Sequence, residues 1–457
     1  MKDNTKNSNL DIFDHAPIPK AILTNTVPAM AAMLMVLVYN LADTFFVGQT
    51  HNALMVAAVS LATPVFLMFM ALGTIFGIGG TSVISRSLGE KKGTYARRVS
   101  SFCMWGSVVT GLIFVVLVFL LQDSILHLIG ASADTWDYTK QYLLIVTAAG
   151  PFVLLSNCYA NIIRAEGRAA TAMAGQLIGN VLNVILDPLL ILGFGWGVVG
   201  AALATSISTV VGAVFYILYL YSGKSMLTPS LRYFSWKEGI LKNVLSIGIP
   251  ASLGDMLMSV SNIAANALIA TYGDMAVAGF GVAMKVTMIT GMICIGFGQG
   301  VQPLFGYCIG AGKWERFRKS LLLSGCSAFA MSTVMTIFCY LFLHSLVSTF
   351  LTDSSAYEYA LSFARILLST SFFFGLYYVF LNALQAMGEA GRALIINLSR
   401  QGLIYLPVLF YLNHRFGVSG LLWAQPVADV LSLVLVILLY GSAWKQWKKE
   451  GVIHETV

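Results

Sequence analysis

The sequence predicts an all-α integral membrane protein with twelve transmembrane helices, arranged as two six-helix bundles related by a pseudo-twofold axis along the membrane normal. Three observations support this fold class: the composition, the spacing of apolar windows and an internal repeat. Of the 457 residues, 58% are hydrophobic and only 10% are charged, and the mean hydropathy is +0.80. Soluble proteins carry about 25% charged residues, so this chain lacks the polar residues that a water-exposed surface requires.

Apolar windows separated by charged or Gly-, Pro- and Asn-rich breaks recur twelve times along the chain. A helix that crosses a bilayer needs about 20 apolar residues. Several windows are longer, which indicates helices that are tilted or extend past the bilayer. We expect helices near residues 20–47, 53–85, 96–121, 138–160, 169–192, 198–221, 240–271, 275–307, 318–343, 357–385, 393–413 and 417–444.

An internal repeat appears at a nearly constant offset of about 221 residues. Three pairs of segments align: GTSVISRSLGEKKGTYARR (80–98) with GVQPLFGYCIGAGKWERFRK (300–319), RAEGRA (164–169) with QAMGEA (385–390), and GVVGAALA (197–204) with GVSGLLWA (417–424). Each half holds six windows, an even number, so both halves enter the membrane from the same side. The repeat is therefore parallel and predicts a central cleft, as in many secondary transporters.

Lysine and arginine fall mainly on one side of the predicted membrane. Cytosolic loops are enriched in these residues, and a cytosolic N-terminus puts 22 of the 27 on the cytosolic side. The exceptions are Lys140, Lys285, Arg365, Arg400 and Arg415. This bias explains the net charge of +7 without a nucleic-acid partner. We expect a multi-pass protein of the plasma (inner) membrane with both termini in the cytosol.

The windows divide the chain into five parts. We expect a cytosolic N-terminal segment (1–19), an N-lobe (20–221), a cytosolic inter-lobe linker (222–239), a C-lobe (240–444) and a cytosolic tail (445–457). The N-terminal segment is polar and lacks the apolar core of a signal peptide.

Motifs typical of soluble enzymes are incomplete. GWGVVG (195–200) matches a dinucleotide-binding pattern, but it follows a long apolar helix and lacks the ribose-binding acid, so it indicates a tight turn. GKS (223–225) lacks the upstream glycine of a phosphate loop, and neither HExxH nor DDxxD occurs. The six cysteines form no CxxC pair, which excludes the usual zinc and disulfide patterns. We expect no enzymatic activity and no resident cofactor or metal, so transport would have to use an ion gradient.

Ionisable residues within the apolar windows are few. Placing a charge at the bilayer centre costs about 2.5–3.5 kcal/mol on insertion scales, and such residues are functional by default. The candidates are Asp43, Asp187, Asp255, Lys285, Arg400 and Asp429.

The N-lobe candidates converge on one polar cluster. Gln176, Asn180, Asn183 and Asp187 share one face of the fifth helix, and a polar stripe must face protein or water. The first and fifth helices run outward and the sixth runs inward, so Asp43, Asp187 and Thr205 lie at similar depth in the outer half of the lobe. Two carboxylates close together in a low dielectric do not both ionise easily. Such a pair can hold a proton, or a Na⁺ on hard oxygen ligands.

The repeat positions of this cluster are not polar in the same way. Asp43 corresponds to Ala264, Asn183 to Ile404 and Asp187 to Val408, while Asn180 corresponds to Gln401. A cluster in one lobe only is typical of a specialised site.

In the C-lobe, Arg400 and Asp429 lie on consecutive helices at middling depth and form a candidate structural ion pair. Asp255 is a candidate substrate or cation contact in the cleft. Flexible methionines and cleft aromatics suit a promiscuous pocket, although ordinary packing explains most such residues. The candidate substrate contacts are Asp187, Asp255, Met33, Met284, Met288 and Phe374. Pro28 is the candidate hinge of the first helix.

Over essentially its whole length the chain resembles the multidrug and toxic compound extrusion (MATE) transporters. The resemblance rests on the two parallel six-helix halves and on YNLADTFFVG (39–48), ISRSLGEKK (84–92) and RAEGRAATAM (164–173), which look like the MepA-like branch. In the archaeal and DinF-like branches, a proton-linked network uses a first-helix Tyr and Asp, an Asn-x-x-x-Asp on helix five and a Thr on helix six. The matching residues here are Tyr39, Asp43, Asn183, Asp187 and Thr205, with Asn180 nearby and Pro28 at the kink position.

The sodium-coupled NorM branch uses acids on helices seven and ten. Asp255 is only roughly placed for the first, and the tenth helix, RILLSTSFFFGLYYVFLNALQ, has no acid. This departure argues against a C-lobe sodium site and leaves Na⁺ at Asp43, Asn183 and Asp187 as an option.

The resemblance implies a cation-coupled antiporter, using H⁺, Na⁺ or both, that exports amphipathic and cationic drugs by rocker-switch alternating access. We expect a functional monomer that contacts membrane lipid and small molecules but no nucleic acid. The alternative is a flippase or exporter of lipid-linked or other metabolites from the same superfamily, for which a basic cleft is expected.

Overall fold

The computed structural model describes residues 10–350 and 354–453, and within these ranges the chain is helical with no strand. The first half contains α2 (Ile18–Gly48), α3 (Ala53–Gly89), α4 (Gly93–Leu120), α5 (Gln122–Leu128), α6 (Trp136–Ala148), α7 (Gly150–Ala165), α8 (Ala169–Asp187), the π-helix η1 (Pro188–Gly193) and α9 (Gly197–Tyr221). The short helix η2 (Leu231–Tyr233) follows in the linker. The second half contains α10 (Ile240–Ala270), α11 (Asp274–Gly310), α12 (Trp314–Leu341), α13 (Leu343–Ser348), α14 (Ser354–Leu368), η3 (Ser371–Phe373), α15 (Phe374–Met387), α16 (Ala390–Leu398), the π-helix η4 (Ser399–Leu403) and α17 (Tyr405–Lys449).

Within the described residues, up to eleven apolar stretches are long enough to cross a membrane, if α6 and α7, which meet at a bend of 53°, count as one. The last stretch, Ala390–Lys449, has 60 residues, enough for two crossings. Gly417, with φ 59°, breaks α17 at the point where the two crossings meet. The prediction of twelve transmembrane helices agrees with this count. The final helix continues to Lys449, beyond the window that ends at residue 444.

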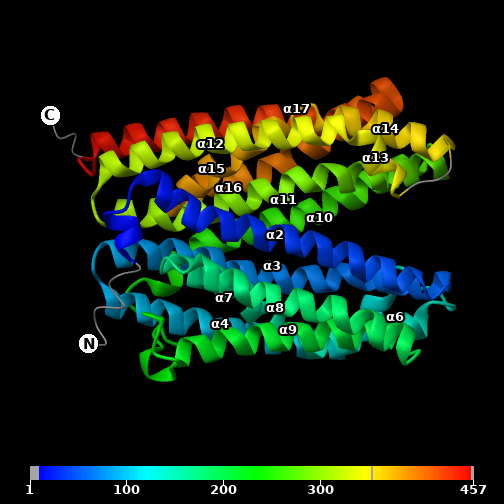
Figure 1. The fold of residues 1–457 in the computed structure, drawn as a ribbon, viewed down its shortest axis with the longest axis horizontal. Coiled ribbons are helices and arrows are strands. Elements are labelled where there is room, and N and C mark those ends of the chain that lie inside the picture. The colour runs from blue at the N-terminus through cyan, green and yellow to red at the C-terminus, as the bar shows by residue number, and fades with distance from the viewer. Residues whose placement is uncertain (1–9, 351–353, 454–457) are drawn as a thin grey trace.

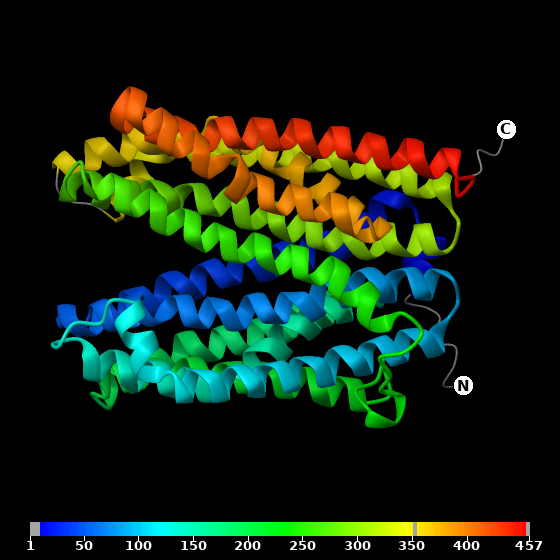
Figure 2. The ribbon, with the colours of Figure 1, turned by 180° about the vertical axis from the view of Figure 1, so that it is seen from behind.

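The helices form two bundles that lie side by side, with both termini at one end of the molecule (Figure 1) and the same division seen from behind (Figure 2). The bounds of α11 and α12 each lie 221 residues after those of α3 and α4. Gly197 and Gly417, which begin the repeated GVVG and GVSG segments, both have positive φ. The structure thus confirms the repeat. We call the end that carries the termini the terminal end.

The lobes touch through α2 against α11 and through α3 against α10. Glycines allow close approach there: a Cβ at Gly248 would lie 1.9 Å from the carbonyl oxygen of Ile75, and one at Gly300 would lie 2.7 Å from the Cα of Thr26. Hydrogen bonds between the lobes occur at the same end. Arg164 Nη2 donates to Gln299 Oε1 over 2.9 Å, and Arg86 Nη1 donates to the carbonyl oxygen of Met387 over 3.3 Å. The structure is therefore closed at the terminal end.

The linker packs along the N-lobe. Its residues Met226, Pro229 and Ser230 offer carbonyl oxygens to side chains of α4, and the Glu166 carboxylate accepts hydrogen bonds from Ser225 Oγ and from the backbone N–H of Met226. Burial raises the pKa of Glu166, although these hydrogen bonds oppose the shift. The linker is thus attached to one lobe only before it enters α10.

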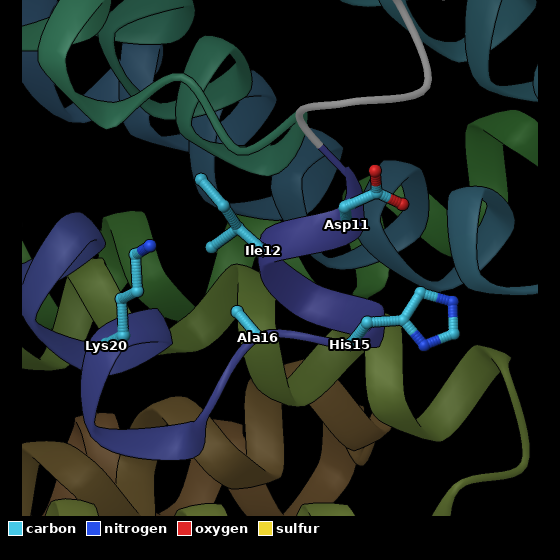
Figure 3. A pocket seen from close by; sticks show the side chains of 5 residues that line it. All are labelled: Asp11, Ile12, His15, Ala16 and Lys20. Atoms are coloured by element: carbon cyan, nitrogen blue, oxygen red, sulfur yellow. The ribbon is translucent and has the colours of Figure 1, made fainter.

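Residues 10–14, before α2, form a short helical turn that binds the C-lobe. Phe13 is fully buried, with its ring 5.6 Å from that of Tyr307 on α11. Arg316 Nε donates to the carbonyl oxygen of Phe13 over 2.7 Å. On its outer side this segment borders a groove of about 440 Å³ lined by Asp11, Ile12, His15, Ala16 and Lys20 (Figure 3), which lies at the terminal end and away from the buried acids.

Candidate functional site

The N-lobe acids are positioned by a change of helix type. Asp187 is the last residue of α8, and the π-helix η1 begins at Pro188, which has no backbone N–H to continue the α-helical ladder. Single π-helical turns inside helices are frequent at functional sites. The Asp187 side chain is completely buried, and Asn183, one turn earlier on the same face, is 1% exposed.

Three helices meet at this face of α8. Asn183 Nδ2 lies 3.4 Å from Thr205 Oγ1 on α9, and Thr205 is also buried. Asp43 of α2 lies close enough to Asp187 for their charges to interact. Tyr39, one turn before Asp43, interacts with Asp43, Asp187 and the Thr205 hydroxyl. The structure therefore brings together the five residues that the sequence predicted as a network.

Asp43 contributes a carboxylate oxygen with unused capacity. Its Oδ1 atom is buried and accepts no hydrogen bond from the described residues. Buried polar atoms without a partner are uncommon in proteins. A bound proton or a cation with oxygen ligands would satisfy this atom.

Tyr142 on α6 is a member of the cluster that sequence reasoning missed. It is 6% exposed and interacts with Asp43, Tyr39 and the Thr205 hydroxyl. The only available signal is general: a tyrosine in an apolar window needs a hydrogen-bond partner for its hydroxyl. The bend between α6 and α7 directs this helix toward α9, and no periodic pattern in the sequence predicts that bend.

The remaining polar residues of the α8 stripe lie farther from the acids. Asn180 and Gln176 are half-buried, and their atoms Nδ2 and Oε1 have no hydrogen-bond partner among the described residues. They extend the polar face of α8 toward the terminal end without joining the acids directly.

Asp255 lies between the lobes. It is exposed on α10, interacts with the Thr74 hydroxyl of α3 in the opposite lobe, and lies near Tyr378 of α15. Thr74 in turn accepts a hydrogen bond from Asn157 Nδ2 over 3.1 Å. The position of Asp255 agrees with its prediction as a residue of the cleft.

Arg400 and Asp429 form the buried ion pair that the sequence suggested. Arg400 Nε lies 3.0 Å from Asp429 Oδ1, and Gln425 Nε2 donates to the same oxygen over 2.9 Å. The guanidinium lies over the rings of Phe374 and Tyr377 at 4.9 and 5.0 Å. Phe374, predicted to contact substrate, is thus buried against Arg400, and its contact with substrate stays a prediction.

The other predicted residues are dispersed. Met33, Met284 and Met288 are half-buried, and Met284 packs against the apolar core of the C-lobe. Lys285 Nζ lies 5.3 Å from the ring centre of Phe350. Pro28 lies within α2, which is a single helix from Ile18 to Gly48.

Comparison with known proteins supports the architecture. The family model described as MatE matches residues 28–189 and 250–411, one segment in each lobe. The multidrug export protein MepA of Staphylococcus aureus is 33% identical over 438 residues, which cover 95% of this chain and 96% of that protein. MepA of Staphylococcus saprophyticus is 32% identical over 434 residues with the same coverage.

Solved structures agree in fold. A MATE structure in complex with MaL6 superimposes with a TM-score of 0.92, and a multidrug resistance MATE family transporter in an outward-facing conformation superimposes with a TM-score of 0.91. Each is 26% identical and covers 96% of this chain and 99% of its own.

Proposed function

Because the chain belongs to the MATE family, we propose that it is a multidrug exporter that exchanges amphipathic cations for H⁺ or Na⁺ through the N-lobe cluster. The family relation supports a multi-pass membrane transporter of small molecules rather than an enzyme. The choice of ion, the cationic class of substrate and the cytosolic position of the termini are parts of the proposal.

The single observation that carries the proposal is the meeting of Asp43 and Asp187 in one lobe. Two acids share a buried site with Asn183, Thr205 and two tyrosines, and the repeat positions of the acids in the other lobe are Ala264 and Val408. A structural role alone would need no second acid near the first. A site that alternates between empty and ion-loaded states does need groups that can hold and release a charge.

The closed terminal end supports alternating access. With the termini in the cytosol, the lobes are closed toward the cytosol, which agrees with the likeness to a relative described as outward-facing. In this state Asp43 and Asp187 load H⁺ or Na⁺ from outside and substrate leaves. The lobes then rock, the ion leaves to the cytosol, and a new substrate enters. One charge moving down 100 mV supplies about 2.3 kcal/mol for uphill export.

Substrate recognition is assigned to the space between the lobes. Asp255 supplies a carboxylate there, and half-buried methionines such as Met288 supply flexible apolar surface. A positively charged, apolar compound complements both.

The test uses inside-out vesicles, a fluorescent amphipathic cation, and separately imposed proton and sodium gradients. Wild type should accumulate the cation when one of the two gradients is applied, and that gradient identifies the ion. Asp187→Asn should lose the response, whereas Asp274→Asn, which removes an exposed acid at the start of α11, should retain it. Thermal unfolding of both variants checks that they fold. A folded Asp187→Asn protein that responds like wild type contradicts the proposal.

The same assay addresses the flippase alternative. A flippase of lipid-linked anions would need unpaired cations between the lobes, but Arg400 is neutralised by Asp429 and covered by aromatic rings. Transport of a labelled lipid-linked anion without transport of the cation would favour the alternative.

A further inference from the structure

A groove runs along the membrane-facing side of the C-lobe near the terminal end. It lies between α12, α15 and α17 and has a volume of about 430 Å³, within the range of about 300–1,000 Å³ usual for small-molecule sites. Arg318, Leu322, Cys326, Phe380, Tyr440 and Trp444 line it.

The internal repeat shows what occupies the equivalent place in the N-lobe. At an offset of 221 residues, Arg97, Ser101 and Trp105 of α4 correspond to Arg318, Leu322 and Cys326 of α12. The N-lobe side chains bind the linker: Arg97 Nε donates to Met226 O over 3.1 Å, Ser101 Oγ to Ser230 O over 2.8 Å, and Trp105 Nε1 to Pro229 O over 3.0 Å. The N-lobe groove is therefore filled by the protein's own backbone.

No described segment takes that place in the C-lobe. α17 ends at Lys449, and residues 450–453 turn back onto the end of this helix through hydrogen bonds to Trp447 O. The difference is visible in exposure: Tyr159 of the N-lobe is buried, whereas its counterpart Phe380 is only half-buried. The C-lobe groove is thus a repeat of a filled site, left open toward the membrane.

The substitutions between the two grooves define the chemistry of the occupant. The donors Ser101 and Trp105, which pair with peptide carbonyls, are replaced by Leu322 and Cys326, so the C-lobe groove has lost the means to bind a backbone segment. The arginine is retained. Arg318 is exposed, forms no ion pair with a described residue, and lies near the Tyr440 hydroxyl.

We propose that this groove binds an anionic phospholipid of the bilayer, with the phosphate at Arg318 and an acyl chain along Leu322, Cys326 and Phe380. The basic residues Lys319 and Lys445 at the same end add to the attraction for an anionic head group. The lipid fills the place that the linker fills in the other lobe.

The test uses the thiol of Cys326 as a reporter in the purified full-length protein in detergent. Cys326 is exposed and the other five cysteines are buried, so N-ethylmaleimide should modify it first. Intact-mass spectrometry gives the rate, and Cys326→Ala gives the background. Phosphatidylglycerol should slow the reaction about tenfold when present at about ten times its dissociation constant, while phosphatidylcholine and inorganic phosphate should not.

Two variants separate the head group from general charge. Arg318→Gln should abolish the protection, and Lys319→Gln, which removes the same charge one residue away from the groove, should preserve it. Filling the groove on another wall with Gly325→Leu should lower reactivity and remove the lipid dependence. Equal protection by both phospholipids, protection that survives Arg318→Gln, or no protection at all would each overturn the proposal. Loss of protection on deleting residues 454–457 would instead identify the chain's own tail as the occupant.

Discussion

The guanidinium of Arg400 lies 3.0 Å from the carboxylate of Asp429 inside the C-lobe, with both side chains more than nine-tenths buried. Asp429 also receives hydrogen bonds from Gln425 and Thr370, and three aromatic rings surround the guanidinium. Every charge at this site thus has a partner. This arrangement favours a structural pair over a second ion-coupling site.

Removing one member of the pair should therefore destabilise the protein strongly. We expect Asp429→Ala to cost about 3–5 kcal/mol, because it leaves a buried, uncompensated guanidinium. The double variant Arg400→Met with Asp429→Leu should recover much of that loss. Thermal unfolding in detergent measures both, and Asp123→Ala, which breaks the exposed pair with Lys140, is the control. A stable Asp429→Ala protein that has lost its ion dependence would show that the pair takes part in coupling.

Tyr142 should support the ion at Asp43 and Asp187. Its hydroxyl lies among Asp43, Tyr39 and Thr205, so Tyr142→Phe removes a polar partner without changing the ring. We expect a loss of about 1 kcal/mol, or roughly fivefold in apparent affinity for the coupling ion. The measurement is the ion concentration that gives half-maximal transport. Tyr138→Phe, one turn earlier on α6, should behave as wild type, and a similar shift in both variants would count against a specific role for Tyr142.

Much of the fold follows from patterns that the sequence displays directly. The apolar windows predict the helices because each crossing must bury its backbone hydrogen bonds within one segment. The spacing of Asn183 and Asp187, together with helix direction, predicts that they face Asp43 and Thr205, and the structure places them together. Periodicity and topology were sufficient for these contacts because all four residues lie on long helices.

Other features have no such pattern. The π-helices η1 and η4 change the helix register through backbone hydrogen bonds, which leave no periodic signature in the side chains. The linker was expected to be a cytosolic connection, but Arg97 and Trp105 hold it through its carbonyl oxygens, and any residue can offer these. The docking of residues 10–14 on the C-lobe likewise depends on backbone acceptors.

The glycines between the lobes should control which side of the protein is closed. A Cβ at Gly248 or Gly300 would meet backbone atoms of the opposite lobe. We expect Gly248→Ala and Gly300→Ala to destabilise this conformation by about 1–3 kcal/mol and to favour opening at the terminal end. Gly281→Ala and Gly291→Ala on α11, where a Cβ would meet nothing within 4 Å, are matched controls.

Spin labels can measure this equilibrium. Labels on cysteines at His51 and Thr271, both exposed at the end opposite the termini, report the distance between the lobes in a Cys326→Ala background. That distance should shorten in the Gly248 and Gly300 variants and stay unchanged in the controls. Identical distance distributions in all four variants would refute the argument.

Residues 10–14 should act as a latch for the closed terminal end. They continue directly into α2 of the N-lobe but are held by the C-lobe, where Arg316 Nη2 also donates to Ala16 O over 2.6 Å and Lys313 Nζ lies 2.6 Å from Asp14 Oδ1. Separation of the lobes at this end must break these contacts or bend the chain near Pro17. Arg316→Gln should therefore favour the open terminal end, by about 1.5–3 kcal/mol if the charge-assisted bonds are lost, whereas Lys319→Gln should not.

The latch should not respond to pH in the physiological range. Burial alone would raise the pKa of Asp14, but the hydrogen bond and charge of Lys313 outweigh burial and hold the pKa below its ordinary value. A lowered pKa means that the pair stabilises the latch fully above about pH 4, the ordinary value for an aspartate, and loses this contribution only below it. Hydrogen exchange of residues 10–16, corrected for intrinsic rates, should show constant protection from pH 8 to pH 5. Protection that falls across this range would mean that the latch, and not the N-lobe acids alone, contributes to the pH dependence of transport.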